Sequence, residues 1–231
     1  MAEEVMGQDP LRAGSPLRTP RAAAVAGIAF SVLLITSLTL LRLSVPASPA
    51  VAGQWLTDPG RRAAVAVGLN LVPFAGIAFL WFVGVLRDRI GEREDRFFAT
   101  VFLGSGLLFV AMLFVGAAVA GSVIAGVTPN AMPGRDTLVL GRNVTVSLLN
   151  VYSMRMAAVF TLTTVNIARH TRIVSRWLTL AGLACAVVLL IGIGISPWVE
   201  LLFPVWILAL SLEVLMARRR TLTQTAARPE G

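Results

Sequence analysis

Charged side chains inside apolar segments are the residues of this chain whose chemistry is most informative. Arg155, Glu200 and Glu213 are the charged residues at such positions. An arginine at the centre of a bilayer costs about 2.5–3.5 kcal/mol on insertion scales, so it is expected to face the interior of a bundle and to have a partner. We therefore expect Arg155 to pair with a carboxylate of another segment.

Depth in the membrane predicts which carboxylate that partner is. Arg155 lies 11 residues into a segment that begins near Val144, which places it about 16 Å deep. Glu213 differs from it in depth by about 8 Å and Glu200 by about 12 Å, so Glu213 is the expected partner. One hypothesis is a structural ion pair that joins two helices, and the other is an anion-binding or proton-coupled site.

Two asparagines extend this candidate intramembrane polar site, which then comprises Arg155, Glu213, Glu200, Asn70 and Asn150. Pro73 follows Asn70 and removes a backbone hydrogen bond. A proline-broken segment beside a polar residue is typical of transporter sites near the midplane, and it also bends ordinary helices. The segment 144–168 is the richest in polar residues, so we expect it to be central, with side chains bonded to neighbouring helices.

Residues for catalysis, for cofactor binding or for metal binding are not predicted. The chain has one histidine, His170, and one cysteine, Cys185, which are too few for a Cys/His zinc site. The sequence contains no P-loop, no Rossmann glycine pattern and no Gly-x-Ser-x-Gly elbow. We therefore expect no cofactor and no enzymatic activity, with lipid-directed catalysis as the weakest alternative.

Apolar helices must position these polar residues. The 231 residues are 56% hydrophobic and 14% charged, with a mean hydropathy of +0.79, whereas soluble domains are about 25% charged. A bilayer core of about 30 Å requires roughly 20 apolar residues per helix. Six segments meet or approach that length, namely 22–43, 59–86, 98–127, 144–168, 178–195 and 197–216. We predict an all-α, polytopic membrane helix bundle with six transmembrane helices.

The arginines predict the orientation of this bundle. All 20 basic residues are arginine, and 14 of them lie in segments 12–21, 87–96, 169–176 and 218–228, on one side of the six spans. Five lie on the other side, so the positive-inside rule places both termini in the cytoplasm. A composition rich in Ala, Gly, Val and Arg is typical of GC-rich coding, so we expect a bacterial inner membrane.

The segments outside the spans are expected to be tails and short loops. Residues 1–21 and 217–231 are rich in charged and polar residues with scattered Gly and Pro, which predicts disordered cytoplasmic tails around a membrane domain of residues 22–216. Residues 44–58 and 128–143 are predicted to be short outer loops. The first span is longer than the apolar region of a signal peptide, so we expect it to be retained.

The hairpin at Ser196-Pro197-Trp198, together with six helices and inside termini, loosely resembles the bacterial relatives of the endolysosomal six-helix potassium channel. That family carries an Arg-x-x-x-Phe-Ser-Asp motif in its first helix. In this chain Phe30-Ser31 is followed by Val32, and Arg21 lies nine residues before Phe30. The motif is absent, so the channel role is not carried over.

Two function classes remain. The first is a structural or accessory membrane protein that packs with other membrane proteins or with its own copies, for which pairs such as Gly116 and Ala120 provide close helix contacts. The alternative is a small transporter or ion channel with a midplane polar site around Arg155. The bilayer is the expected environment in both classes. Nucleic acid is not an expected partner, because the arginines flank the spans and form no single basic stripe.

Overall fold

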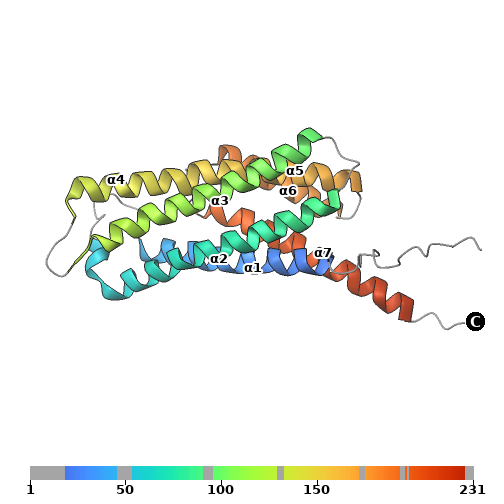
Figure 1. Cartoon of the computed structure of the whole chain (residues 1–231), viewed down its shortest axis with the longest axis horizontal. Coiled ribbons are helices and arrows are strands. Elements are labelled where there is room, and N and C mark those ends of the chain that lie inside the picture. Colours follow the sequence, from blue (N-terminus) through green and yellow to red (C-terminus); the bar gives the residue numbers. More distant parts are fainter. Residues whose placement is uncertain are drawn as a thin grey trace, which may run out of the picture.

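The computed structural model describes residues 19–45, 54–90, 96–128, 133–171, 175–192, 196 and 198–226. The regular elements in these ranges are helices, as predicted (Figure 1). They are α1 (Thr19–Ser44), the 3₁₀ helix η2 (Gln54–Thr57), α2 (Pro59–Ile90), α3 (Arg96–Ala125), α4 (Arg135–Val146), the π-helix η4 (Ser147–Tyr152), α5 (Ser153–Thr171), α6 (Arg176–Ile191), the 3₁₀ helix η5 (Val199–Leu201) and α7 (Leu202–Ala226).

The lengths and compositions of the helices show a multi-pass membrane protein. Within the described residues, five stretches are long and apolar enough to cross a bilayer: Arg21–Ser44, Pro59–Arg87, Phe97–Ala125, Arg135–Arg169 and Val199–Met216. The fourth stretch consists of α4, η4 and α5, which follow one another without a break. The helix α6 is apolar but has only 16 residues.

Several predicted boundaries need correction. The predicted loop 128–143 is helical from Arg135 onward. Asp136 in the first turn of α4 favours this helix start. The prolines and glycine of the predicted loop, Pro129, Pro133 and Gly134, all precede α4. The helix α7 continues to Ala226, so residues 217–226 are helical and do not begin a disordered tail. The helix α6 ends at Ile191, earlier than the predicted residue 195. Residues 1–18, 193–195 and 197 lie outside the described residues, as do 227–231.

The start of α2 is as the sequence predicts, with Asp58 as the N-cap and Pro59 at the first helical position. Asp58 Oδ1 accepts hydrogen bonds from the backbone N–H groups of Gly60 at 2.8 Å and Arg61 at 3.3 Å. An aspartate at this position satisfies N–H groups that have no partner within the helix, and Pro59 has no N–H to satisfy. The position of α2 is therefore encoded locally, at the point where the chain re-enters the apolar region.

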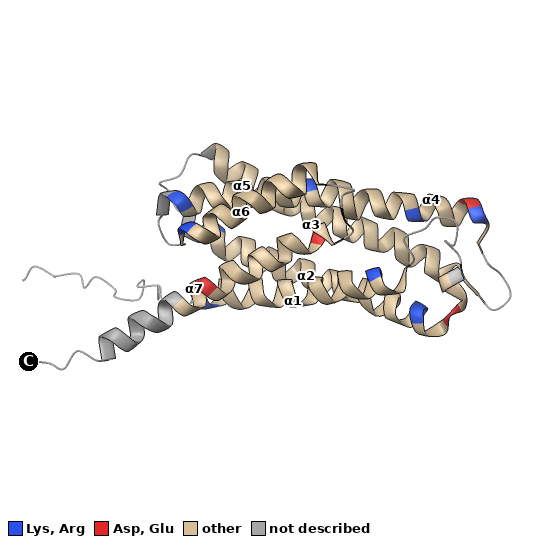
Figure 2. Cartoon of the chain, turned by 180° about the vertical axis from the view of Figure 1, so that it is seen from behind, with Lys and Arg blue, Asp and Glu red and all other residues tan. Residues whose placement is uncertain are grey.

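The helices pack as two groups joined by α3 (Figures 1 and 2). The helix α1 packs along α2 and α7, while α5 packs along α6. The helix α3 contacts both α2 and α5, and so connects the two groups. Close approach of α1 and α2 is visible in a hydrogen bond from Ser37 Oγ to the carbonyl oxygen of Gly68 at 2.7 Å.

A cluster of buried phenylalanines forms the centre of the bundle. Phe79 of α2 lies with its ring centroid 4.7 Å from that of Phe30, 5.1 Å from Phe109, 5.0 Å from Phe160 and 5.8 Å from Phe203. These five rings come from α2, α1, α3, α5 and α7, and all are fully buried. Aromatic rings at such separations attract one another in tilted or edge-to-face arrangements. This cluster therefore holds the two groups of helices together.

Candidate functional site

The predicted pairing of Arg155 with Glu213 is wrong. Arg155 is exposed on α5, and no ion pair or hydrogen bond of its side chain occurs within the described part of the chain. Depth in the membrane did not identify the partner of Arg155, because the direction in which a side chain projects depends on the rotation of its helix about the helix axis. The adjacent Met154 projects into the core and is buried, so Arg155 projects outward.

Glu213 instead joins α7 to the start of α6. Its Oε1 accepts a hydrogen bond from the backbone N–H of Ser175 at 2.7 Å, and its Oε2 accepts one from the Ser175 hydroxyl at 3.0 Å. Ser175 is the N-cap residue of α6, and its Oγ also accepts a hydrogen bond from the N–H of Leu178 at 3.4 Å. A carboxylate at this helix start is favoured by the unsatisfied N–H groups and by the helix dipole.

Glu200, and not Glu213, forms an ion pair with an arginine, and that arginine is Arg42. It is a buried residue of η5, only 6% exposed, and its Oε1 accepts a hydrogen bond from Nη2 of Arg42. Arg42 lies in the last turn of α1. The two residues form a partly buried ion pair between segments 158 residues apart in the sequence. In the sequence, Arg42 was indistinguishable from the arginines that only determine orientation.

The two asparagines have separate roles. Asn70 is exposed on α2, and its amide donates a hydrogen bond to the carbonyl of Ala66 at 2.8 Å. Asn150 is half-buried on η4 and borders a cavity. Among the five predicted site residues, the structure brings only Glu200 and Asn150 to the same place.

The hydroxyls of α5 also differ from expectation. Thr161 donates to the carbonyl of Ala157 at 2.8 Å and Thr164 to that of Phe160 at 2.7 Å, while Ser153 donates to Leu149. These residues are buried, but they bond within their own helix and do not bond across helices. They therefore satisfy their polar groups locally.

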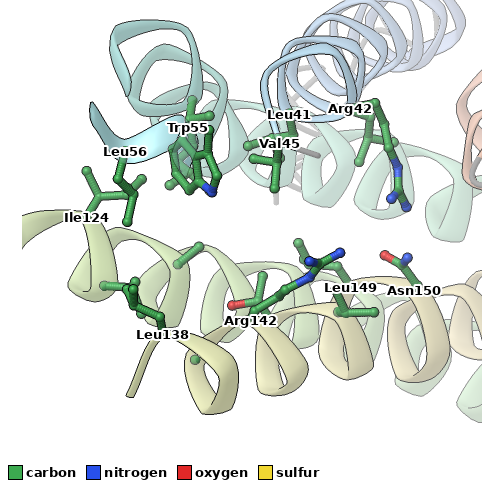
Figure 3. Close-up of a pocket in the computed structure, with 18 of the residues that line it drawn as sticks. Leu41, Arg42, Val45, Trp55, Leu56, Ile124, Leu138, Arg142, Leu149 and Asn150 are labelled. Atoms are coloured by element: carbon green, nitrogen blue, oxygen red, sulfur yellow. The ribbon is translucent and has the colours of Figure 1, made fainter. Parts of the chain in front are cut away.

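A cavity of about 320 Å³ lies between the two groups of helices, at the end of the bundle where α1 finishes and α2 starts. One wall is formed by α1, η2 and α2, and the opposite wall by α3, α4 and η4. Figure 3 shows Arg42 on one wall and Arg142 and Asn150 on the other, with their polar ends directed into the space between. The cavity therefore has a polar region with cationic groups on both walls.

Most of the remaining lining is apolar. It includes the buried side chains Trp55, Leu56, Val65 and Leu69 beside η2 and α2, with Ile124 and Leu138 opposite them. Ligand pockets typically combine a mostly apolar lining with a few polar groups that orient the ligand. The shape and composition of this cavity suit a small amphipathic molecule.

The charged groups of the cavity favour an anion. Arg42 and Arg142 contribute two positive charges and Glu200 contributes one negative charge, so the lining carries a net charge of +1. Thr145 Oγ1 is also in the lining, and it is buried without a hydrogen-bond partner within the described residues. An arginine favours carboxylate, phosphate or sulfonate groups because it donates several hydrogen bonds in one plane. Arg142 was not predicted as a site residue, because residues 128–143 were predicted to form a loop.

The π-helix η4 contributes to this geometry. A π-helix inserts an extra residue in each turn, so it changes the direction in which side chains project. In η4, Leu149 is buried against α3, where a Cβ added to Gly116 would lie 2.7 Å from Leu149 Cδ2, and Asn150 borders the cavity. A π-helix within an α-helix often marks a functional site. No residue pattern in the sequence predicted it.

The phenylalanine cluster lies deeper in the bundle than the cavity. Phe30 precedes Arg42 by 12 residues on α1, which corresponds to about 18 Å. Between them, Leu34 and Leu38 are buried, and Leu38 borders the cavity. None of the five clustered phenylalanines lines the cavity.

Within the described ranges, no group of three or more His, Cys, Asp or Glu residues could hold a metal ion. Cys185 is buried on α6 and is not among the residues that line the cavity.

Comparisons with protein-family models, with curated proteins and with solved structures find no match to this chain.

Proposed function

We propose that the chain crosses a bacterial plasma membrane six times, with both termini in the cytoplasm. The sixth span is α6, whose 16 residues extend about 24 Å, enough for a short apolar helix to cross with local thinning of the bilayer. The arginines support the orientation: Arg169 and Arg176 flank the end of the bundle at which α7 leaves it, and the cavity lies at the opposite end.

Cysteine labelling tests this topology. In a Cys185→Ala background, Arg176→Cys at the start of α6 should react with a membrane-impermeant maleimide only from the cytoplasmic side. Trp198→Cys, beyond the other end of α6, should react only from the outside. Labelling of both positions from the same side would show that α6 does not cross the membrane.

For function, we propose that this protein binds a small amphipathic anion from the outer side of the membrane. The observation that supports this most directly is the cavity of about 320 Å³ with Arg42 and Arg142 on facing walls and an apolar lining beside them. The anionic head would lie between the arginines and hydrogen-bond to Asn150 or Thr145. The hydrocarbon part would lie against Trp55, Leu56 and Leu69.

Binding of decanesulfonate, a ten-carbon chain with a permanent negative charge, tests this function. Purified protein in phosphatidylcholine nanodiscs should bind decanesulfonate by calorimetry, and should bind decyltrimethylammonium and decanol at least tenfold more weakly. Arg142→Gln should weaken binding of decanesulfonate by tenfold or more, because a hydrogen bond to a charged group contributes about 1.5–3 kcal/mol.

Arg135→Gln is the matched control, since Arg135 lies on the same helix seven residues earlier, is exposed and does not line the cavity. This variant should bind like the wild type. Equal affinity for the anion, the cation and the alcohol would contradict the proposal, as would unchanged binding in Arg142→Gln.

Transport of the anion is a second candidate, and η4 is the observation that favours it. A π-helix in the cavity wall can convert to α-helix and rotate the residues beyond it, which would move Asn150 relative to Arg42. Proteoliposomes should then accumulate radiolabelled decanesulfonate, and Arg142→Gln should abolish the uptake. Binding without uptake would leave a receptor or accessory role as the function of the cavity.

A further inference from the structure

Arg155 lies half way along the continuous helix formed by α4, η4 and α5. It follows Arg142 by 13 residues and precedes Arg169 by 14 residues, distances of about 20 Å and 21 Å along the axis. The hydrocarbon core is about 30 Å thick. Arg155 is therefore near the middle of the membrane, too far from either interface for its side chain to reach the headgroups.

The face of α5 that carries Arg155 is apolar for two turns beyond this residue, and Asn166 is the next polar residue on it. Tyr152, one turn earlier, is 56% exposed. Val159 and Leu162, one and two turns later, are half-buried. Met154, Ala157 and Ala158 of the same continuous helix are buried in the bundle. The structure therefore presents a cation to the lipid on the outer surface of the protein.

The described spans of this chain do not supply a counter-ion for Arg155. Their carboxylates are Glu200, which is paired with Arg42, and Glu213, which accepts two hydrogen bonds from Ser175. Asp58 and Asp136 lie at helix starts, at the end of the bundle that contains the cavity. A second copy of the chain would present the same engaged carboxylates, so self-association would place Arg155 beside apolar side chains.

We propose that the α5 face around Arg155 binds a membrane-spanning helix of a different protein that carries an aspartate or glutamate near its middle. An unpaired arginine at this depth is energetically unfavourable, and pairing with a carboxylate offsets that cost. Tyr152, three residues before Arg155, lies on the same face of the helix, and its hydroxyl can donate a hydrogen bond to the same carboxylate. This partner site is independent of the ligand cavity, because Arg155 and Tyr152 are not in the cavity lining.

A designed helix is a suitable probe for this surface. It consists of leucine and alanine with one central glutamate, and its control has leucine in place of the glutamate. Energy transfer between labelled probe and full-length protein is measured in phosphatidylcholine vesicles. We expect the glutamate helix to associate at least tenfold more strongly than the leucine helix.

Substitutions in the protein separate the role of Arg155 from that of charge in general. Arg155→Leu should remove the tenfold preference, and Arg155→Lys should keep part of it. Arg169→Leu, a matched control at the exposed end of the same helix, should leave the preference intact. Because the Arg155 side chain is exposed, Arg155→Leu should keep the thermal stability of the wild type. If that variant does not fold, Arg155→Gln provides the same comparison.

Several results would overturn the proposal. These are equal association of the two probes, an unchanged preference in Arg155→Leu, and association that occurs only in vesicles containing phosphatidylglycerol. The last result would identify an anionic lipid as the partner of Arg155. Energy transfer between two labelled copies of the protein that is lost in Arg155→Leu would assign the face to self-association.

Discussion

Glu200 of η5 accepts a hydrogen bond from Arg42 of α1, and this ion pair joins the end of the first helix to the beginning of the last. The side chain of Glu200 is 8% exposed and that of Arg42 is 28% exposed, so the carboxylate is the more deeply buried partner. A buried charge without its partner is strongly destabilising. The pair therefore fixes the position of one cavity wall and also sets the charge balance of the cavity.

Exchange of the two charges tests this structural role. Arg42→Gln and Glu200→Gln should each lower the free energy of unfolding by about 2–3 kcal/mol, while Arg42→Glu combined with Glu200→Arg should recover at least half of the loss. The measurement is reversible unfolding in mixed micelles. The control is the exposed pair of Arg61 with Asp58, at 3.5 Å with side chains 50% and 52% exposed, whose disruption by Arg61→Gln should cost under about 1 kcal/mol. If the loss of unfolding free energy in the double variant equals the sum of the losses in the two single variants, the ion pair does not have this structural role.

The contact of Glu213 with Ser175 predicts a dependence of α6 on α7. Ser175→Ala should destabilise the protein by about 1 kcal/mol, since an N-cap is lost. Glu213→Leu should have a similar effect, and the double variant should be less destabilised than the sum of the two, because both remove the same interaction. Thermal denaturation measured by circular dichroism checks this. Strict additivity would show that the two residues stabilise the protein independently.

The aromatic cluster predicts a large effect at Phe79. Phe79→Ala should lower the free energy of unfolding by about 3 kcal/mol, because the vacated space removes contacts with five other rings. Phe74→Ala is the matched control on the same helix, since Phe74 is 62% exposed, and it should change stability by less than about 1 kcal/mol. Similar losses in both variants would contradict the central position of Phe79.

Gly27 predicts how closely α1 and α7 approach each other. A Cβ at Gly27 would lie 3.0 Å from Phe82 and closer still to Ser211 Oγ. Gly27→Ala should therefore destabilise the protein by about 1–3 kcal/mol, and adding Ser211→Gly should restore part of the loss. At Gly84 of α2 a Cβ would have nothing within 4 Å, so Gly84→Ala should be neutral or stabilising. Equal stability of the two alanine variants in thermal unfolding would contradict this packing.

Features that depend on short stretches of the chain were predictable. The apolar lengths predicted membrane-crossing helices, and Asp58 with Pro59 predicted the start of α2, because a cap involves only a few adjacent residues. The start of α4 was missed although its signal was present. Asp136 follows Gly134 and a proline, which is a common helix start, but the polar composition of 128–143 suggested a loop.

The candidate site was predictable only in part. Glu200 and Asn150 were identified because polar residues in apolar segments are rare. Arg42 and Arg142 were not, because arginines near the end of a span are also expected from the positive-inside rule. Their role became visible only when α1 and α4 were placed on facing sides of a cavity.

The sequence by itself determined that this chain forms apolar helices in a membrane, since hydropathy and length depend on composition along a single segment. The tertiary structure decided which charges meet. The rotation of a helix about its axis depends on how it packs against the other helices, and a rotation of half a turn exchanges buried for exposed residues. That rotation directs Glu200 to Arg42, Glu213 to Ser175, and Arg155 to the outer surface.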